Sequence, residues 1–124
     1  MDKANIDSVT RLSGLQEAFL IHHLQVGYKD KGIIQMHADI SGNLTGDLFL
    51  KAWKKALSEL PALRTSFHWK DLKRPVQIVQ KEVSLNSKSL DWSDETTEVI
   101  NDNWEALLGR DRKTIQLDQS PVSI

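Results

Sequence analysis

The 124-residue chain contains no cysteine, which excludes disulfide bonds, thiolate nucleophiles and cysteine-ligated zinc. It also has almost no excess charge, because 16 basic and 17 acidic residues leave a formal net charge of -1. Proteins that bind nucleic acids or anionic membranes need a basic surface, so this balance argues against both kinds of partner. No apolar run is long enough to span a membrane, and the N-terminal residues lack the apolar segment of a signal peptide. We therefore expect a soluble, cytoplasmic protein.

What the chain does contain is the composition of a globular domain. Hydrophobic residues make up 40% and charged residues 27% of the sequence, which is the balance of a folded protein rather than a disordered one. A length of 124 residues is sufficient for one compact domain and too short for two ordinary ones.

Three stretches carry the signals of helices. Ser13 followed by Gln16 is a capping box, which predicts a helix over residues 14–25. Thr45 is placed to cap a second helix, and Ser93 to cap a third whose first turn is acidic. Apolar residues recur at helical spacing in the second helix (Phe49, Ala52, Trp53, Ala56, Leu57, Leu60) and in the third (Val99, Ile100, Trp104, Leu107, Leu108).

Alternating apolar and polar residues predict strands between these helices. Residues 33–42 predict a half-buried strand whose apolar face holds Ile34, Met36, Ala38 and Ile40. Pro61 ends the second helix, after which residues 63–69 and 75–80 predict a hairpin. Residues 115–124 have the composition to begin a further strand. The predicted order is α-β-α-β-β-α-(β), an α+β fold in which helices pack on a mixed, interrupted sheet.

Adjacent histidines at positions 22 and 23 raise the question of acid–base or metal chemistry. Neighbours on a helix point about 100° apart, so the pair cannot serve one small ligand. We expect His22 to pack on the apolar stripe of its helix and His23 to flank it. His37 and His68 approach each other only if their strands pair, and two histidines without a further ligand make a poor metal site. The sequence therefore predicts no metal site and no catalytic residue.

Arg64 is the remaining candidate for a functional side chain. It projects from the predicted strand face opposite Leu63 and Phe67, beside Ser66 and His68. One interpretation is a solvated strand residue. The other is an arginine aimed into a cleft, where its planar guanidinium holds a carboxylate. The pattern alone leaves both open.

Taken in order, these segments resemble the beginning of a condensation domain of nonribosomal peptide synthetases. Residues 12–24, with Ser13 and Gln16, resemble the first core motif of that family. Residues 40–67 resemble the stretch that leads into the second core motif, Arg-His-x-x-Leu-Arg-Thr-x-Phe. The matching positions of this motif are Leu63, Arg64, Thr65 and Phe67, whereas Glu59 and Leu60 replace its Arg-His pair. The segments HWKDLKRPVQIV, LDW and LLGRDRKTIQLDQSP follow in family order.

The resemblance implies a fold and an activity. It implies that residues 1–124 are a single partial domain, the first part of the N-terminal lobe of a chloramphenicol-acetyltransferase-like fold. The complete domain joins an acyl group on one carrier protein to the amine of an aminoacyl group on another. Both substrates are thioesters on phosphopantetheine arms, and the resemblance implies no cofactor bound directly by this chain.

The family's catalytic signature, His-His-x-x-x-Asp-Gly, is not the pair at 22 and 23. Counting from His22, Gly27 and Tyr28 stand where the aspartate and the glycine belong. The resemblance places the signature beyond Ile124, and it implies that Arg64 pairs with the aspartate of that motif. We therefore expect a fragment that is inactive alone and needs the remainder of the domain.

Two further expectations follow from this interpretation. The alternative to an enzyme fragment is a non-catalytic, condensation-like module that docks a carrier protein or another partner protein. In either case an incomplete sheet leaves an unpaired edge, which favours self-association.

Overall fold

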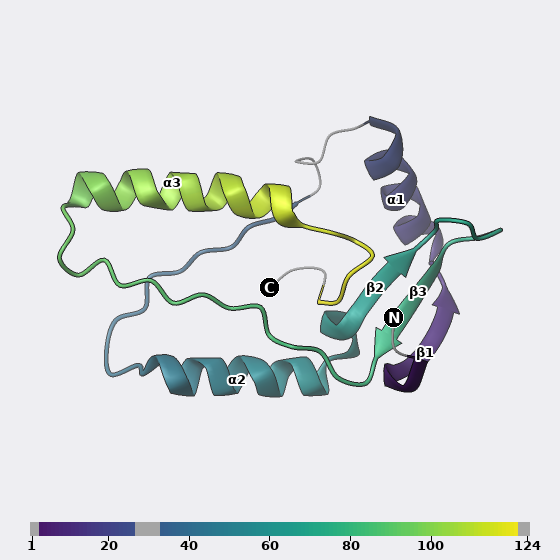
Figure 1. Ribbon diagram of the computed structural model, residues 1–124, viewed down its shortest axis with the longest axis horizontal. Helices are drawn as coiled ribbons and strands as arrows, with labels where there is room; N and C mark the ends of the chain where they lie inside the picture. The colour runs from purple at the N-terminus through teal and green to yellow at the C-terminus, as the bar shows by residue number, and fades with distance from the viewer. Residues whose placement is uncertain (1–2, 27–32, 122–124) are drawn as a thin grey trace.

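The computed structural model describes residues 3–26 and 33–121, and it contains three helices and one three-stranded sheet (Figure 1). The helices are α1 (Gly14–Val26), α2 (Gly46–Glu59) and α3 (Thr97–Thr114), with short 3-10 helices η1 (Lys3–Asn5) and η2 (Pro61–Arg64). The strands are β1 (Ile6–Arg11), β2 (Thr65–His68) and β3 (Val76–Gln80). The predicted α+β class is confirmed.

The sheet is built around β3, which pairs antiparallel with β1 on one side and with β2 on the other. Ile78 is its central residue, opposite Val9 in β1 and Ser66 in β2. The described strands therefore form an antiparallel sheet and not the mixed sheet that we predicted. The hairpin of β2 and β3 is confirmed, and its turn places Asp71 at a φ of 59°, a left-handed conformation that aspartate tolerates.

Strand β1 is absent from the predicted order. Its residues, IDSVTR, do not alternate between apolar and polar, and only the first of them is half-buried. The strand forms because the free edge of β3 offers it hydrogen-bond partners. Asn5 supports the junction: its side chain donates to the Glu82 carbonyl at 2.8 Å and accepts from the Glu82 amide at 3.0 Å.

The predicted helix starts are confirmed where a local cap defines them. The Ser13 hydroxyl accepts from the Gln16 amide at 3.2 Å, and the Gln16 side chain accepts from the Ser13 amide at 2.8 Å. Thr45 accepts from the Leu48 amide at 3.4 Å, which caps α2. These contacts leave fewer amide groups of the first turn unsatisfied.

The third helix begins later than predicted. Its N-cap is Thr96, whose hydroxyl accepts from the Val99 amide at 3.4 Å. The prediction of Ser93 as the cap is wrong because the Ser93 amide and hydroxyl both donate to the Asp91 carboxylate, at 3.0 and 2.7 Å. This local turn competes with helix formation at that position.

The predicted strand over residues 33–42 is also wrong. The segment is extended, but none of the backbone hydrogen bonds among the described residues involves residues 33–41. The predicted apolar face is the exposed one, with Ile34 87% and Met36 93% exposed. Residues 115–121 form no strand either, although the Leu117 carbonyl accepts from the Phe67 amide of β2 at 2.7 Å. Residues 122–124 of that prediction lie outside the described part of the chain.

The hydrophobic core of the described residues is small. Its buried apolar side chains are Leu20 of α1, Leu57 of α2 and Ile78 of β3. Helices α2 and α3 extend to one side of the sheet, with extended segments running between them (Figure 1). The accessible surface is 9960 Å², whereas a compact protein of this mass exposes about 6,700 Å². Much apolar surface is therefore uncovered.

No helix in the described ranges is both long and apolar enough to cross a membrane.

Replacing Leu57 with alanine should lower the free energy of unfolding by about 2–4 kcal/mol, because a buried leucine leaves a cavity when truncated. Leu57 is 3% exposed, whereas Leu48 of the same helix is 60% exposed. Leu48→Ala should therefore cost under about 1 kcal/mol. Urea unfolding monitored by circular dichroism measures both, and equal losses would show that α2 is not anchored through Leu57.

Candidate functional site

Arg64 lies at the junction of η2 and β2, and it is 8% exposed. One terminal nitrogen of its guanidinium donates to the carbonyl oxygens of Gln80 and Lys81, the latter at 3.1 Å. These carbonyls belong to the end of β3 and the residue after it. Arg64 is therefore not a solvated strand residue, because its charge is buried against backbone oxygens.

The contacts of Arg64 leave part of its hydrogen-bonding capacity unused. Its Nε is buried and has no hydrogen-bond partner among the described residues. Two carbonyl dipoles compensate a positive charge only in part, and a buried guanidinium is more stable when a carboxylate completes its contacts. The described part of the chain supplies no carboxylate ion pair to Arg64. The Nε–H of Arg64 is therefore available to donate a hydrogen bond to one further acidic partner.

Ser66 and His68 form a polar pair next to Arg64 on β2. Ser66 is fully buried, and its Oγ shares a hydrogen bond of 2.9 Å with Nε2 of His68. Asp118 lies close enough to influence His68, but it pairs with Lys70 at 2.9 Å. A serine nucleophile must reach its substrate and needs a histidine oriented by a third group. A buried serine and an aspartate engaged elsewhere do not meet these conditions.

The environment shifts the pKa values of His68 and Asp118. Burial lowers the pKa of His68, because it disfavours the charged imidazolium, and the nearby Asp118 carboxylate opposes that effect. The hydrogen bond from Lys70 holds the pKa of Asp118 below its usual value. Together with the bond between Phe67 and Leu117, this ion pair attaches residues 117 and 118 to β2 and to the turn that follows it.

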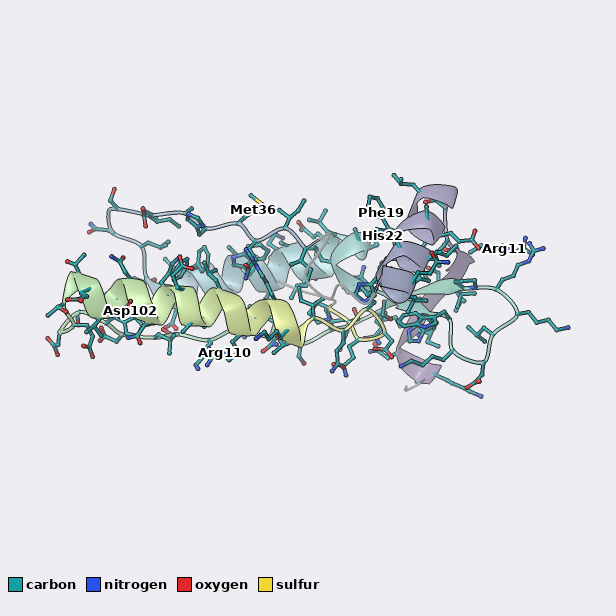
Figure 2. All side chains as sticks on the ribbon, turned by 90° about the horizontal axis from the view of Figure 1, so that it is seen from above. Arg11, Phe19, His22, Met36, Asp102 and Arg110 are labelled. Carbon is teal, nitrogen blue, oxygen red and sulfur yellow. The ribbon has the colours of Figure 1, made fainter. Side chains whose placement is uncertain are left out.

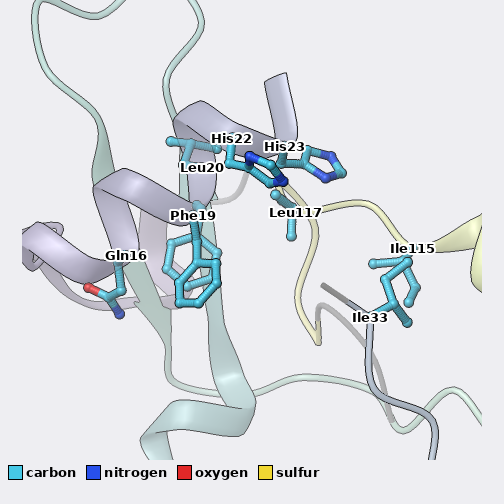
Figure 3. A pocket seen from close by; sticks show the side chains of 9 residues that line it. Gln16, Phe19, Leu20, His22, His23, Ile33, Ile115 and Leu117 are labelled. Atoms are coloured by element: carbon cyan, nitrogen blue, oxygen red, sulfur yellow. The ribbon is translucent and has the colours of Figure 1, made fainter. Parts of the chain in front are cut away.

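The two adjacent histidines line an apolar cavity of 460 Å³ between α1 and the C-terminal segment (Figure 3). His22 is exposed and His23 is half-buried, so our expectation of a packed His22 with His23 on its flank is wrong. The reason is that α1 buries Leu20, which is 4% exposed, rather than the stripe that contains His22, whose Phe19 remains 62% exposed. The cavity walls come from four separate stretches of sequence, which local patterns could not have brought together: Gln16, Phe19, Leu20, His22 and His23; Ile33; Phe67; Ile115 and Leu117.

The remaining histidines have different neighbours. The ring of His37 packs edge-on against Trp104 of α3, with centroids 6.0 Å apart, whereas His68 contacts Ser66. No cluster of three histidine, aspartate or glutamate residues that could hold a metal ion occurs in the described ranges. Trp53 packs edge-on against Phe49 at 6.3 Å, as expected of a tryptophan in a helix stripe.

Comparison with known proteins points to one family. Residues 6–123 match the family described as Condensation domain. A linear gramicidin synthase of Brevibacillus parabrevis is 32% identical over 109 residues, covering 88% of this chain and 1% of that protein. A second linear gramicidin synthase polypeptide from the same organism is 31% identical over 119 residues, covering 95% of this chain and 2% of that protein. Malpinin synthetase of Mortierella alpina is 29% identical over 119 residues, which is 96% of this chain and 2% of the relative. The chain spans only a small part of these relatives.

Replacing Arg64 with methionine should lower the free energy of unfolding by about 1.5–3 kcal/mol, the contribution of hydrogen bonds to a charged group. The carbonyls of Gln80 and Lys81 would lose their donor. Arg74→Met is the matched control, because Arg74 is exposed and its loss should change stability by under about 0.5 kcal/mol. Chemical denaturation compares the two, and an unaffected Arg64→Met variant would contradict the assigned contacts.

Acidification should destabilise the chain through His68. Its pKa in the folded chain lies below the usual value, so the unfolded chain takes up the proton first as the pH falls. Stability is therefore lost as the pH drops from above about 6.5 towards the lowered pKa.

The His68→Gln variant should lose less stability than the parent between about pH 7.5 and about pH 5.5. Glutamine cannot titrate but keeps a polar group near Ser66. His22→Gln, at an exposed position, should keep the parent's acid sensitivity. If His68→Gln and the parent respond equally in urea titrations at both pH values, burial of His68 does not control the response.

Proposed function

The chain belongs to the condensation-domain family, and we propose that it supplies the first part of the N-terminal lobe of an amide-forming domain in a nonribosomal peptide synthetase. The match over residues 6–123 carries this proposal. The order of the two core motifs supports it, since Ser13 and Gln16 cap α1 as the first motif requires. The three helices and the antiparallel sheet are consistent with a chloramphenicol-acetyltransferase-like lobe.

The reaction of the complete domain is attack by an amine on a thioester. The amine nitrogen forms a bond to the thioester carbon, a tetrahedral oxyanion develops, and the thiol leaves with a proton as the amide forms. Such a reaction needs two substrates held in a reactive geometry and stabilisation of the oxyanion. The substrates are carried on phosphopantetheine arms of carrier proteins, and these carriers are the partners that we propose for the complete domain. We propose the cytoplasm as its compartment.

The role of this chain is structural within that reaction. Its adjacent histidines do not have the spacing of His-His-x-x-x-Asp-Gly, because Gly27 and Tyr28 occupy the acidic and glycine positions. We therefore propose that the catalytic histidine comes from the remainder of the domain. The chain alone is then inactive.

Arg64 is the residue through which this chain would hold the remainder of the domain. Its guanidinium is anchored by the Gln80 and Lys81 carbonyls, and its buried Nε has no partner in the described ranges. A carboxylate placed beside Nε would complete the contacts of the buried charge. We propose that the aspartate of the histidine motif supplies this carboxylate, which makes Arg64 a positioning residue and not a catalytic one.

The isolated chain should form no amide from loaded donor and acceptor carrier proteins. Addition of a polypeptide that carries the remainder of a condensation domain, including its histidine motif, should restore product formation. Arg64→Gln should weaken the binding of that polypeptide by at least about tenfold, because the loss leaves a buried carboxylate unpaired. Mass spectrometry of the acceptor carrier measures product, and titration calorimetry measures binding.

Arg74→Gln is the matched control and should bind as the parent does, since Arg74 is exposed. Amide formation by the isolated chain would contradict the proposal that the catalytic histidine comes from the remainder of the domain. Equal binding by the Arg64→Gln and Arg74→Gln variants would overturn the role of Arg64.

A further inference from the structure

The side chain of Gln16 joins α1 to the sheet. Its amide oxygen accepts from the Ser13 backbone at 2.8 Å, and its amide nitrogen donates to the side-chain oxygen of Gln77 in β3 at 3.1 Å. The amide nitrogen of Gln77 in turn donates to the Arg11 carbonyl at the end of β1, at 3.4 Å. Each side-chain amide thus has one orientation that satisfies both of its neighbours. The two glutamines form a continuous link from α1 to two strands of the sheet.

The covered face of α1 is the face that carries this link. Gln16 and His23 are half-buried, and Leu20 between them is 4% exposed. These positions are spaced i, i+4 and i+7, so they lie on one side of the helix. Figure 2 shows His22 on the side of α1 that is turned away from Arg11. The rotation of α1 places an amide and an imidazole beside a single leucine, which apolar packing alone does not select.

Strand β3 holds Arg64 as well as α1. The Gln80 and Lys81 carbonyls accept hydrogen bonds from Arg64, and Gln77 lies three residues before Gln80 on the same strand. Because β3 is paired on both of its sides, it belongs to the part of a sheet that opens least readily. The helix of the first core motif and the arginine of the second are therefore attached to two points of one strand.

We propose that Gln16 and Gln77 are positioning residues, whose link sets the rotation of α1 and holds this helix in a fixed relation to Arg64. Without the link α1 is free to turn about its own axis. Adjacent helical residues point about 100° apart, so such a turn exposes His23 and covers His22. The importance of this rotation for amide formation rests on the proposed function, in which Arg64 holds the remainder of the domain.

Engineered cysteines measure the rotation, since the chain has none of its own. The His22→Cys and His23→Cys variants are alkylated in native buffer, and each rate is divided by the rate of the same variant in urea. Labelling at position 22 should be at least about threefold faster than at position 23, because the reactivity of a thiol follows its exposure. Adding Gln77→Leu should bring this ratio to about one. Adding Gln77→Glu should preserve it, because a carboxylate still accepts from the Gln16 amide nitrogen.

Two controls separate a rotation of α1 from a general loss of stability. Gln25→Leu changes an exposed glutamine of the same helix and should leave the labelling ratio as it is in the parent. Ser66→Cys reports opening of the sheet, because Ser66 is fully buried. With Gln77→Leu present, its labelling should stay at least about tenfold slower than at either α1 position. A ratio unchanged by Gln77→Leu, a ratio changed equally by Gln77→Glu, or fast labelling at position 66 would overturn the proposal.

Amide formation with the remainder of the domain added tests the consequence for the reaction. Gln77→Leu should lower kcat by at least about tenfold and leave KM for the loaded carriers unchanged, because misplaced groups slow a reaction between bound substrates. Gln77→Glu should keep the kcat of the parent. A kcat unaffected by Gln77→Leu would contradict the positioning role. If the parent combination itself forms no amide, the proposed function fails, and the labelling ratio still decides whether the link sets the rotation of α1.

Discussion

The structure depends on the antiparallel pairing of β3 with strands on both of its sides. Ile78 lies opposite Val9 and Ser66 and forms the centre of the sheet. The carbonyl at the end of β3 and the next one along the chain accept hydrogen bonds from Arg64. The position of β3 therefore determines both the sheet and the environment of the buried arginine. Without these carbonyls the guanidinium would be a buried charge with no compensating contact, which is a costly arrangement.

Away from the sheet, the chain is held by few buried contacts. Leu57 anchors α2, but Ile34, Met36 and Ile40 of the segment 33–41 remain exposed, and the apolar face of α3 is only partly covered, with Trp104 at 36%. Exposed apolar surface of this extent favours association with other protein surfaces. The same property supports the proposed completion by the remainder of a condensation domain.

The predictions that succeeded were those governed by short-range geometry. The capping box of Ser13 and Gln16, the cap at Thr45 and the β2–β3 hairpin each depend on residues close in sequence. The prediction of Ser93 as a cap is wrong because its bonds to Asp91 are an equally local alternative. Strand β1 has no alternating pattern, so its existence depends on the distant edge of β3. The strand pattern leaves Arg64 open to a solvated or a cleft-facing interpretation, and only the fold shows its burial and its partners.

The sequence by itself determined the α+β class, the places where α1 and α2 begin, and the motifs that mark a condensation domain. These features follow from caps, periodicity and residue identity within short windows. Only the tertiary structure decided that Arg64 is buried against the carbonyls of Gln80 and Lys81. It likewise decided that His23 rather than His22 is half-buried and that the apolar face of residues 33–41 points outward. The physical reason is that an alternating pattern separates two faces of a segment, whereas contacts with distant elements decide which face is covered.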